Sequence, residues 1–366
     1  MQRWPCKHPW KMDGSGCALY FFPDIALPPS PTCVMRMNIA VIIVLVVSAL
    51  IAWKIYDMAA RPMPPSMLYP LVPPTAEAPE FRDTVPSEAF FREGFAKNGL
   101  AGQWDFFRTQ LRPEIQMLVE PANESSFLPG QSKIGGQPDL PAGMAWFTEG
   151  NGNHLSFIAQ INLAEVRSLD TTGQLPSTGI LYFFYSTEYT GGYDILDKDK
   201  FRVYYYDGDS SSLLRTHFPY DLGEYSRYKP CRLRFRPSVS LPDRDLDYVS
   251  ARLNGEESRN YYDVTKNYYT GTNKLLGHSD NIQNPMELEC EMVTHGIYLG
   301  EPSGFNDPRL NEMKKNSRDW ILLFQLDSND EAGMMWGDAG MLYFWIKKED
   351  LRQKKFDRCW MISQCG

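Results

Sequence analysis

Two glutamines, Gln160 and Gln325, are the first candidates for chemistry because each stands inside an otherwise apolar run. A buried amide without a hydrogen-bond partner costs about 1–3 kcal/mol, so each of these side chains has to find one. In one interpretation each amide ties its strand to a neighbouring backbone segment. In the other, both amides face a central ligand site. The sequence favours the backbone role and leaves the ligand site open.

The WGDAG segment is the second candidate, because Trp336 offers an aromatic face and Asp338 a carboxylate. Gly337 and Gly340 permit a tight turn with exposed backbone N–H groups. Turn formation alone also explains these residues, so ligand binding by Trp336 and Asp338 is the alternative to a purely structural turn. A calcium loop is not indicated by the spacing of the nearby carboxylates Asp327, Asp330 and Glu331.

Histidine and cysteine spacing gives no support for a metal site or a cofactor. No two histidines have HxxxH spacing and no CxxC pair occurs. His278 precedes Ser279 and Asp280, which are the residue types of a nucleophilic triad. Adjacent side chains point in different directions, however, and triads are assembled from distant positions, so a turn is the favoured interpretation. We keep His278 as a candidate ligand-binding residue and predict no catalytic residue.

The elements that position these residues are expected to be strands, and the strands repeat. LSFIAQIN at 155–162 aligns with WILLFQLD at 320–327, which places Gln160 opposite Gln325. GILYFF at 179–184 aligns with GMLYFW at 340–345. Each half is therefore expected to contribute an equivalent pair of strands. The fold class predicted is α+β: a β-rich single domain with an internal pseudo-twofold duplication, preceded by a transmembrane helix.

The start of the domain is expected to be largely helical from Ser87, a helix cap, to Leu118. The helical spacing is that of Phe107, Leu111, Ile115 and Leu118. Gly99 and Gly102 are expected to separate two helices, and Pro121 to end the second.

Four cysteines fall in this domain: Cys231, Cys290, Cys359 and Cys365. They allow three disulfide connectivities, and buried free thiols are the equal alternative. The pair Cys359 and Cys365 would be the easiest to close locally.

The first 86 residues are expected to lie outside the globular fold. Residues 37–56 include an uncharged apolar run and are predicted to form an uncleaved transmembrane anchor. Residues 1–36 form an N-terminal tail, which is absent if translation begins at Met35 or Met37. Residues 57–86 are rich in proline and are interpreted as an extended spacer before a domain at 87–366.

Charge sets the expected orientation and excludes one class of partner. Four basic residues precede the span and two follow it, which favours a cytoplasmic N-terminus. We therefore expect a single-pass membrane protein with its domain on the outer side of a bacterial inner membrane. The net charge of -8 argues against nucleic acid as a partner, since phosphate binding requires clustered Lys and Arg. The expected partners are the membrane, through the N-terminal helix, and an unknown protein or small-molecule ligand.

Several separated motifs resemble the YwqG-like family, whose function is unknown. They are SKIGGQPDLP (132–141), HLSFIAQINLAEV (154–166), KLLGHSDNIQ (274–283), DWILLFQLDSND (319–330) and WGDAGMLYFWIKKEDL (336–351). The resemblance covers roughly residues 87–365 and implies an α+β fold with no established activity. It also implies an immunity or accessory role, because relatives of this family occur near bacterial toxin systems.

The leading hypothesis from the sequence is a membrane-anchored, non-enzymatic recognition or immunity-type accessory domain. One alternative is a hydrolase-like enzyme with a dispersed site formed by Asp327, Asp338 or His278. Such an enzyme requires these groups to converge in one concave pocket with a perturbed carboxylate. A second alternative is a structural envelope protein, which predicts no pocket.

Overall fold

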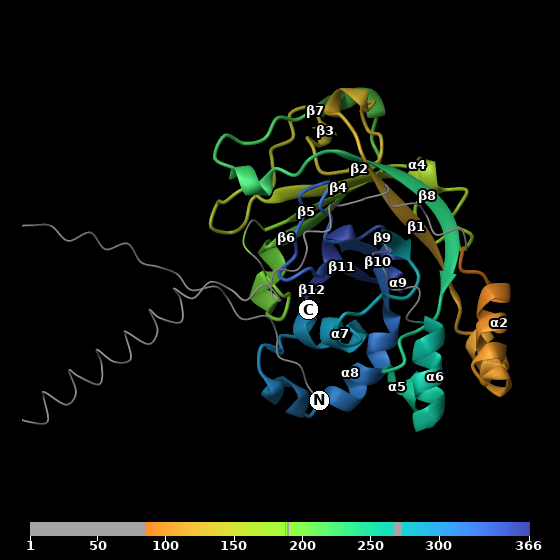
Figure 1. Ribbon diagram of the computed structural model, residues 1–366. Helices are drawn as coiled ribbons and strands as arrows, with labels where there is room; N and C mark the ends of the chain where they lie inside the picture. Colours follow the sequence, from red (N-terminus) through yellow and green to blue (C-terminus); the bar gives the residue numbers. More distant parts are fainter. Residues whose placement is uncertain (1–84, 187, 189, 266–272) are drawn as a thin grey trace, which may run out of the picture. The chain divides into compact units, whose positions relative to one another are not determined.

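A single antiparallel sheet organises the part of the chain that the computed structural model describes, namely residues 85–186, 188, 190–265 and 273–366 (Figure 1). Ten strands form this sheet in the order β12-β11-β10-β9-β1-β8-β2-β4-β5-β6, and β3 pairs with β7 in a separate small sheet. The strands are β1 Arg112–Pro121, β2 Lys133–Ile134, β3 Asp139–Pro141, β4 Ser156–Asn162, β5 Ile180–Tyr185, β6 Phe201–Tyr206, β7 Leu213–Arg215, β8 Cys231–Ser240, β9 Asn273–Leu276, β10 Trp320–Asp327, β11 Met341–Lys347 and β12 Trp360–Gln364.

The two longest strands, β1 and β8, form the centre of the sheet. They pair over their whole length, from Arg112 opposite Ser240 to Pro121 opposite Cys231. β9 to β12 extend the sheet on the β1 side, and β2, β4, β5 and β6 extend it on the β8 side. The central pair therefore separates two arms of four strands each.

The prediction of a helix through Leu118 is wrong, because β1 begins at Arg112 and carries these residues in a strand. Pro113 disfavours a helical conformation at the residue before it. β1 also bonds to β8 on one side and β9 on the other, and residues 114–119 are all buried. Ile115, Met117 and Val119 lie in the main core and alternate with Glu114, Gln116 and Leu118, which is the period of a strand. The helical spacing from Phe107 to Leu118 is therefore a coincidence.

The helix predicted from Ser87 is confirmed at its start. The Ser87 hydroxyl accepts a hydrogen bond from the N–H of Phe90 at 3.2 Å, and α2 follows. Gly99, at φ +71°, lies just beyond the helix end, where the left-handed conformation favours glycine. The α-helices are α2 Glu88–Lys97, α3 Trp104–Arg108, α4 Leu163–Val166, α5 Asp247–Ser250, α6 Gly255–Thr265, α7 Glu287–Thr294, α8 Leu310–Asn316 and α9 Lys348–Arg352.

The two arms fold over one another and enclose the main core, so the sheet is nearly closed. Phe183 of β5 stacks on Phe324 of β10 with ring centroids 4.2 Å apart. At the far end of the arms, the N–H of Ser363 in β12 donates to the carbonyl of Gly191 at 3.1 Å. The indole of Trp360 donates to the next carbonyl, that of Gly192, at 2.9 Å. The connection between β5 and β6 thus covers the outer edge of β12.

A smaller core lies apart from the sheet interior. It joins α2, α3 and α6 to the end of β8 through Phe91, Phe95, Leu100, Trp104, Phe107, Leu241, Val249, Tyr261 and Val264. In Figure 1, α2 and α6 lie together beside the ends of β1 and β8. This cluster fixes the start of β1, which becomes important at the cavity described below.

Both predicted strand pairs are confirmed. β4 pairs with β5 and β10 pairs with β11, each antiparallel and each with a register irregularity at the equivalent place. The irregularity lies between Phe157 and Ala159 in one pair and between Leu322 and Phe324 in the other.

Of the two alternatives left open for the cysteines, a Cys359–Cys365 disulfide is excluded, because Cys359 is a free, buried thiol. Cys231 and Cys290 are also free and buried. Burial raises the pKa of the Cys231 thiol to about 11 and raises the pKa of Cys290 as well, so both thiols are held in the unreactive protonated form.

The predicted tail at 1–36, the span at 37–56 and nearly all of the linker at 57–86 lie outside the described residues. Among the residues that are described, none of the helices combines the length and apolar character needed to cross a membrane.

Candidate functional site

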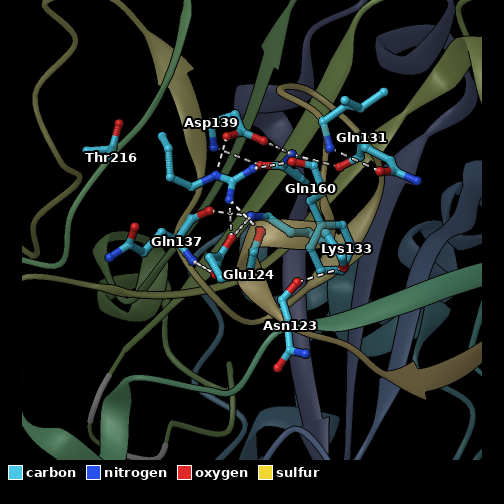
Figure 2. A network of polar contacts seen from close by, with 12 residues as sticks. Asn123, Glu124, Gln131, Lys133, Gln137, Asp139, Gln160 and Thr216 are labelled. Atoms are coloured by element: carbon cyan, nitrogen blue, oxygen red, sulfur yellow. Dashed lines mark hydrogen bonds and ion pairs between the residues drawn. The ribbon is translucent and has the colours of Figure 1, made fainter.

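Gln160 is the centre of a buried polar network between β4, β2 and the residues that follow β2 (Figure 2). Its side chain is fully buried. Its Oε1 accepts from the backbone N–H of Asp139 at 2.9 Å, and its Nε2 donates to Oδ2 of Asp139 and to the carbonyl of Gln131, each at 2.8 Å. The amide therefore ties its strand to neighbouring backbone, which is the role that the sequence favoured.

Two cations and two carboxylates surround this glutamine. Lys133 donates to Oε1 of Glu124 at 2.7 Å, and Arg215 donates to the same oxygen at 2.6 Å. Arg215 also contacts Oδ1 of Asp139 at 2.5 Å. Burial lowers the pKa of Lys133, and the nearby Arg215 lowers it further against the attraction of the two carboxylates. The charges balance, so this network is complete without a ligand.

Gln325 is the centre of a second network with the same connections. Its Oε1 accepts from the N–H of Asp280 at 2.9 Å and its Nε2 donates to Oδ2 of Asp280 at 2.8 Å. Lys274 donates to Oδ1 of Asp280 at 2.8 Å and to Oε2 of Glu114 at 3.0 Å. Burial lowers the pKa of Lys274, but the attraction of Asp280 and Glu114 outweighs burial, so the net shift is upward.

The two networks agree in chain spacing and in backbone conformation. Each lysine precedes its aspartate by six residues and pairs across the sheet with its glutamine. In each network, two consecutive residues between the lysine and the aspartate have left-handed backbone conformations. They are Gly135 and Gly136, at φ +61° and +67°, in the first network, and Leu276 and Gly277, at φ +60° and +79°, in the second. A tyrosine hydroxyl, from Tyr182 or Tyr343, donates to each aspartate carbonyl.

Sequence reasoning missed the lysines and aspartates of these networks. The available signal was the alignment of KIGGQPD at 133–139 with KLLGHSD at 274–280, which repeats the spacing from Lys to Asp. The glutamines were found because an amide in an apolar strand is conspicuous, whereas Lys133 and Lys274 stand in short strands between polar turns and look exposed.

His278 lies in the same turn as Asp280 but points elsewhere. Its ring Nε2 is 2.9 Å from the carbonyl of Gln110, and its side chain is buried. Burial, reinforced by the nearby positive charge of Arg112, keeps the pKa of His278 well below its usual value, so the ring is neutral. The Ser279 hydroxyl donates to Asn281 at 2.6 Å. The three neighbouring residues therefore form a turn without triad geometry.

The structure separates the two candidates of the WGDAG segment. Trp336 is buried, with its ring centroid 5.6 Å from Tyr185 and 5.6 Å from Tyr228. Asp338 is exposed, and its carbonyl accepts from the N–H of Gly366 at 3.1 Å. The aromatic face and the carboxylate are therefore not presented together. Gly340 is required because a Cβ there would come within 2.3 Å of the carbonyl oxygen of Gln364.

A cavity of about 550 Å³ lies elsewhere, between the start of β1, the end of β9, β10, α9 and the loop before β5. Its lining comprises Arg112, Pro113, Gly173, Gln174, Leu175, Pro176, Leu276, Gly277, Ile321, Leu322, Lys348, Leu351, Arg352 and Lys354. None of the five predicted ligand-binding residues is in this lining. A neighbouring cavity of about 390 Å³ shares Gly173, Leu175 and Pro176 with it.

Perturbed carboxylates occur in the domain but lie outside these two linings. Burial raises the pKa of Asp327 to about 6, and burial followed by repulsion from Glu287 raises the pKa of Glu289 to about 8. Within the described ranges, no group of three or more His, Cys, Asp or Glu side chains is placed to hold a metal ion.

Comparison with known proteins places the chain in a family. No curated protein matches it. Residues 132–365, more than half of the chain, match the family model described as a domain of unknown function, DUF1963. The matched segment begins at Ser132 and contains both glutamines, both lysines and both aspartates of the buried networks. The chain therefore belongs to the DUF1963 family of proteins.

Proposed function

We propose that this protein is a non-enzymatic recognition protein whose domain, residues 87–366, binds a ligand in the cavity of about 550 Å³. One observation carries the proposal: the described lining of that cavity contains no carboxylate, histidine, cysteine or hydroxyl side chain. Apart from lysine, these are the side chains that act as nucleophiles or as general acids and bases in proteins. A cavity of this size with apolar and cationic walls is instead suited to holding a small ligand.

The matched networks support a further part of the proposal, that the domain is YwqG-like and arose by duplication of one half. Each half would then contribute one lysine, one aspartate and one glutamine to an equivalent network, together with an equivalent strand pair. Because the amides and charged side chains of both networks already bond to one another, their proposed role is to hold the sheet in register, which leaves the cavity as the recognition site.

The apolar run at 39–53 and the prolines that follow it support a membrane tether for this domain. The excess of basic residues before the run supports an orientation with the domain outside the cytoplasm. An immunity-type or accessory role fits a ligand-binding domain held at a membrane surface.

The two other functions have less support. The hydrolase alternative required Asp327, Asp338 and His278 to converge in a pocket, yet none of the three lines either cavity described above. His278 is buried and neutral, with its ring bound to a backbone carbonyl. The structural alternative expected no pocket, and a cavity of ligand size is present.

Native mass spectrometry of the full chain, purified from its own cells, tests the recognition function. We expect a bound species that is released on unfolding. Gln174→Trp, which places an indole at the cavity wall, should abolish it. Thr171→Trp is the matched control, because Thr171 is exposed in the same loop and is not part of the lining. Equal occupancy in both variants would contradict the assignment of the cavity.

Membrane topology is tested by reporters fused after Cys365. A reporter active only outside the cytoplasm should be active, and a reporter active only in the cytoplasm should be silent. The reverse result would show that the domain faces the cytoplasm and would direct the search for partners to intracellular molecules.

A further inference from the structure

The cavity proposed for recognition has a charge opposite to that of the whole chain. The chain carries a formal net charge of -8, but the described cavity lining holds four cationic side chains, Arg112, Lys348, Arg352 and Lys354, and no acidic one. A concentration of positive charge at one hollow of an acidic protein raises the local concentration of anions. The lining therefore selects against cations and in favour of an acidic ligand.

The four cations are not equally available. Arg352 is engaged by Glu349, its Nε donating to Oε2 at 2.8 Å and its Nη2 to Oε1 at 2.5 Å. Lys354 lies 3.4 Å from the carboxylate of Asp207. Lys348 donates to a neutral acceptor, the carbonyl of Arg318, at 3.1 Å, and makes no ion pair within the described part of the chain.

Arg112 is the second cation of the lining without an ion pair, and its charge also acts on the buried Glu287. Within the residues that the structure describes, its guanidinium makes neither a hydrogen bond nor an ion pair. The side chain is half-buried at the start of β1, where the packing of α2, α3 and α6 against the end of β8 fixes the backbone. A guanidinium has five donors in a rigid planar fork, which suits the paired oxygens of a carboxylate or phosphate.

The floor of the cavity is apolar. Leu175, Ile321, Leu322 and Leu351 are all buried and line the same space as the cations. Lys348 and Arg352, by contrast, are exposed at its rim. A ligand that fills this cavity would meet hydrocarbon on one side and positive charge on the other.

Two residues of the cavity lining have strained backbone conformations. Three non-glycine residues among those described have a positive φ, and two of them, Leu276 at +60° and Lys354 at +56°, line the cavity. Such conformations persist where the surrounding structure enforces them, and they occur preferentially at ligand sites. At the position equivalent to Leu276 the other half has Gly135, where a Cβ would come within 2.1 Å of the carbonyl oxygen of Lys229. The side chain that Leu276 contributes to the cavity therefore has no counterpart at Gly135.

We propose that the ligand of this cavity is a small amphipathic acid, with its carboxylate or phosphate held by Arg112 and Lys348 and its hydrocarbon part against Leu175, Ile321, Leu322 and Leu351. This inference rests on the proposed recognition function and adds the chemical class of the ligand. Carboxylate and phosphate headgroups share the oxygen geometry that a guanidinium recognises, so both belong to the predicted class.

Isothermal titration calorimetry of the full chain with four probes tests the proposal: octyl phosphate, octanoate, octyl glucoside and inorganic phosphate. We expect at least one of the two octyl acids to bind at least about tenfold more tightly than inorganic phosphate, because only the octyl chain reaches the apolar floor. Octyl glucoside, which has the same chain without a charge, should not bind.

The variants Arg112→Gln and Lys348→Gln should each weaken binding of the octyl acid by about tenfold, the usual effect of losing one charged hydrogen-bond donor. Lys315→Gln is the matched control, because Lys315 is exposed on α8 and is not part of the cavity lining. Since Lys348 is also exposed, its replacement is expected to leave folding unchanged, which unchanged urea midpoints would verify.

Several outcomes would overturn the proposal. Equal binding of octyl glucoside would identify an apolar cavity without acid recognition, and equal binding of inorganic phosphate would identify a simple anion site. Wild-type affinity in both Arg112→Gln and Lys348→Gln would remove the assigned cations. A native ligand seen by mass spectrometry, with no binding of either octyl acid, would overturn this inference while leaving the recognition function intact.

Discussion

The side-chain amide of Gln325 holds Asp280 at two points, accepting from its backbone N–H at 2.9 Å and donating to its Oδ2 at 2.8 Å. Gln160 holds Asp139 in the same way. Each clamp fixes the turn after a short strand against the strand beside it. Substitutions at these two contacts, Gln160 with Asp139 and Gln325 with Asp280, should therefore change the stability of the fold measurably.

Replacing either glutamine by leucine should destabilise the protein by about 1–3 kcal/mol, because buried partners lose their hydrogen bonds and an amide is replaced by hydrocarbon. Urea unfolding of Gln160→Leu and Gln325→Leu measures the effect. Gln353→Leu, at an exposed position of the chain, should change stability by no more than about 0.5 kcal/mol. A neutral result at both clamps would mean that water satisfies the freed groups.

The two buried lysines, Lys274 and Lys133, should differ in how much they contribute to the free energy of unfolding. Lys274→Met leaves Glu114 and Asp280 facing each other without their cation, and breaking a buried pair in this way costs about 3–5 kcal/mol. Lys133→Met should cost at least about 1 kcal/mol less, because Arg215 still contacts both Glu124 and Asp139. Comparison of their urea midpoints at neutral pH checks the order, and equal losses would contradict the compensating role of Arg215.

The Lys274→Met variant should also acquire a characteristic pH dependence. Two carboxylates without a cation raise each other's pKa in the folded state, so protonation then favours folding. The loss of stability should therefore shrink as the pH falls from about 8 to about 5. In the wild type, the pKa of Lys274 is raised above its usual value near 10.5, so the charged lysine stabilises the folded state at neutral pH. This stabilisation is lost as the pH rises through the pKa of the lysine in the folded state. Unfolding curves across both ranges distinguish the two cases.

Glu289 gives a separate test of pH dependence, because it is a buried acid whose Oε2 has no hydrogen-bond partner among the described residues. Burial, followed by repulsion from Glu287, raises its pKa from 4.5 to about 8. A raised acid pKa means that stability is highest when the group is protonated in both states, and that it falls between about pH 4.5 and 8 by up to about 1.4 kcal/mol per unit. Glu289→Gln should remove this fall and be more stable than the wild type at pH 8. Glu312→Gln on α8, an exposed position, should leave the pH profile unchanged.

Gly340→Ala should destabilise the fold by about 1–3 kcal/mol or more, because the added methyl group would overlap backbone oxygens of both Gln364 and Trp336. Gly255→Ala is the control, since no atom lies within 4 Å of its Cβ position at the start of α6. Thermal unfolding of both variants gives the comparison. If Gly340→Ala unfolds like the wild type, the turn before β11 is able to shift away from β12.

Short sequence patterns were sufficient to predict part of this fold. The strands that carry Gln160 and Gln325, and the strand paired with each, follow from short apolar runs that recur in the same order. The cap at Ser87 followed from its residue type. These features depend on neighbours within a few residues, which a sequence displays directly.

Features that depend on distant partners were not accessible in this way. β1 had a helical spacing but is held as a strand by β8 and β9, more than a hundred residues away in the chain. Lys274 is neutralised by Glu114, 160 positions earlier, and nothing in the local sequence marks either residue as buried. The sequence made Trp336 a candidate for ligand binding, but Tyr185 and Tyr228 pack against its ring in the fold. Long-range pairing decides such cases, and a single sequence does not display it.

The position of β1 has a consequence for where this domain begins. β1 is the first of the described strands, yet it lies between β8, from the middle of the chain, and β9, from further along it, and brings Glu114 to Lys274. The family match starts at Ser132 and omits β1. A fragment cut at that boundary would leave the edges of β8 and β9 bare and Lys274 with one carboxylate fewer. We therefore expect the smallest unit that folds on its own to be longer than the family segment and to include β1.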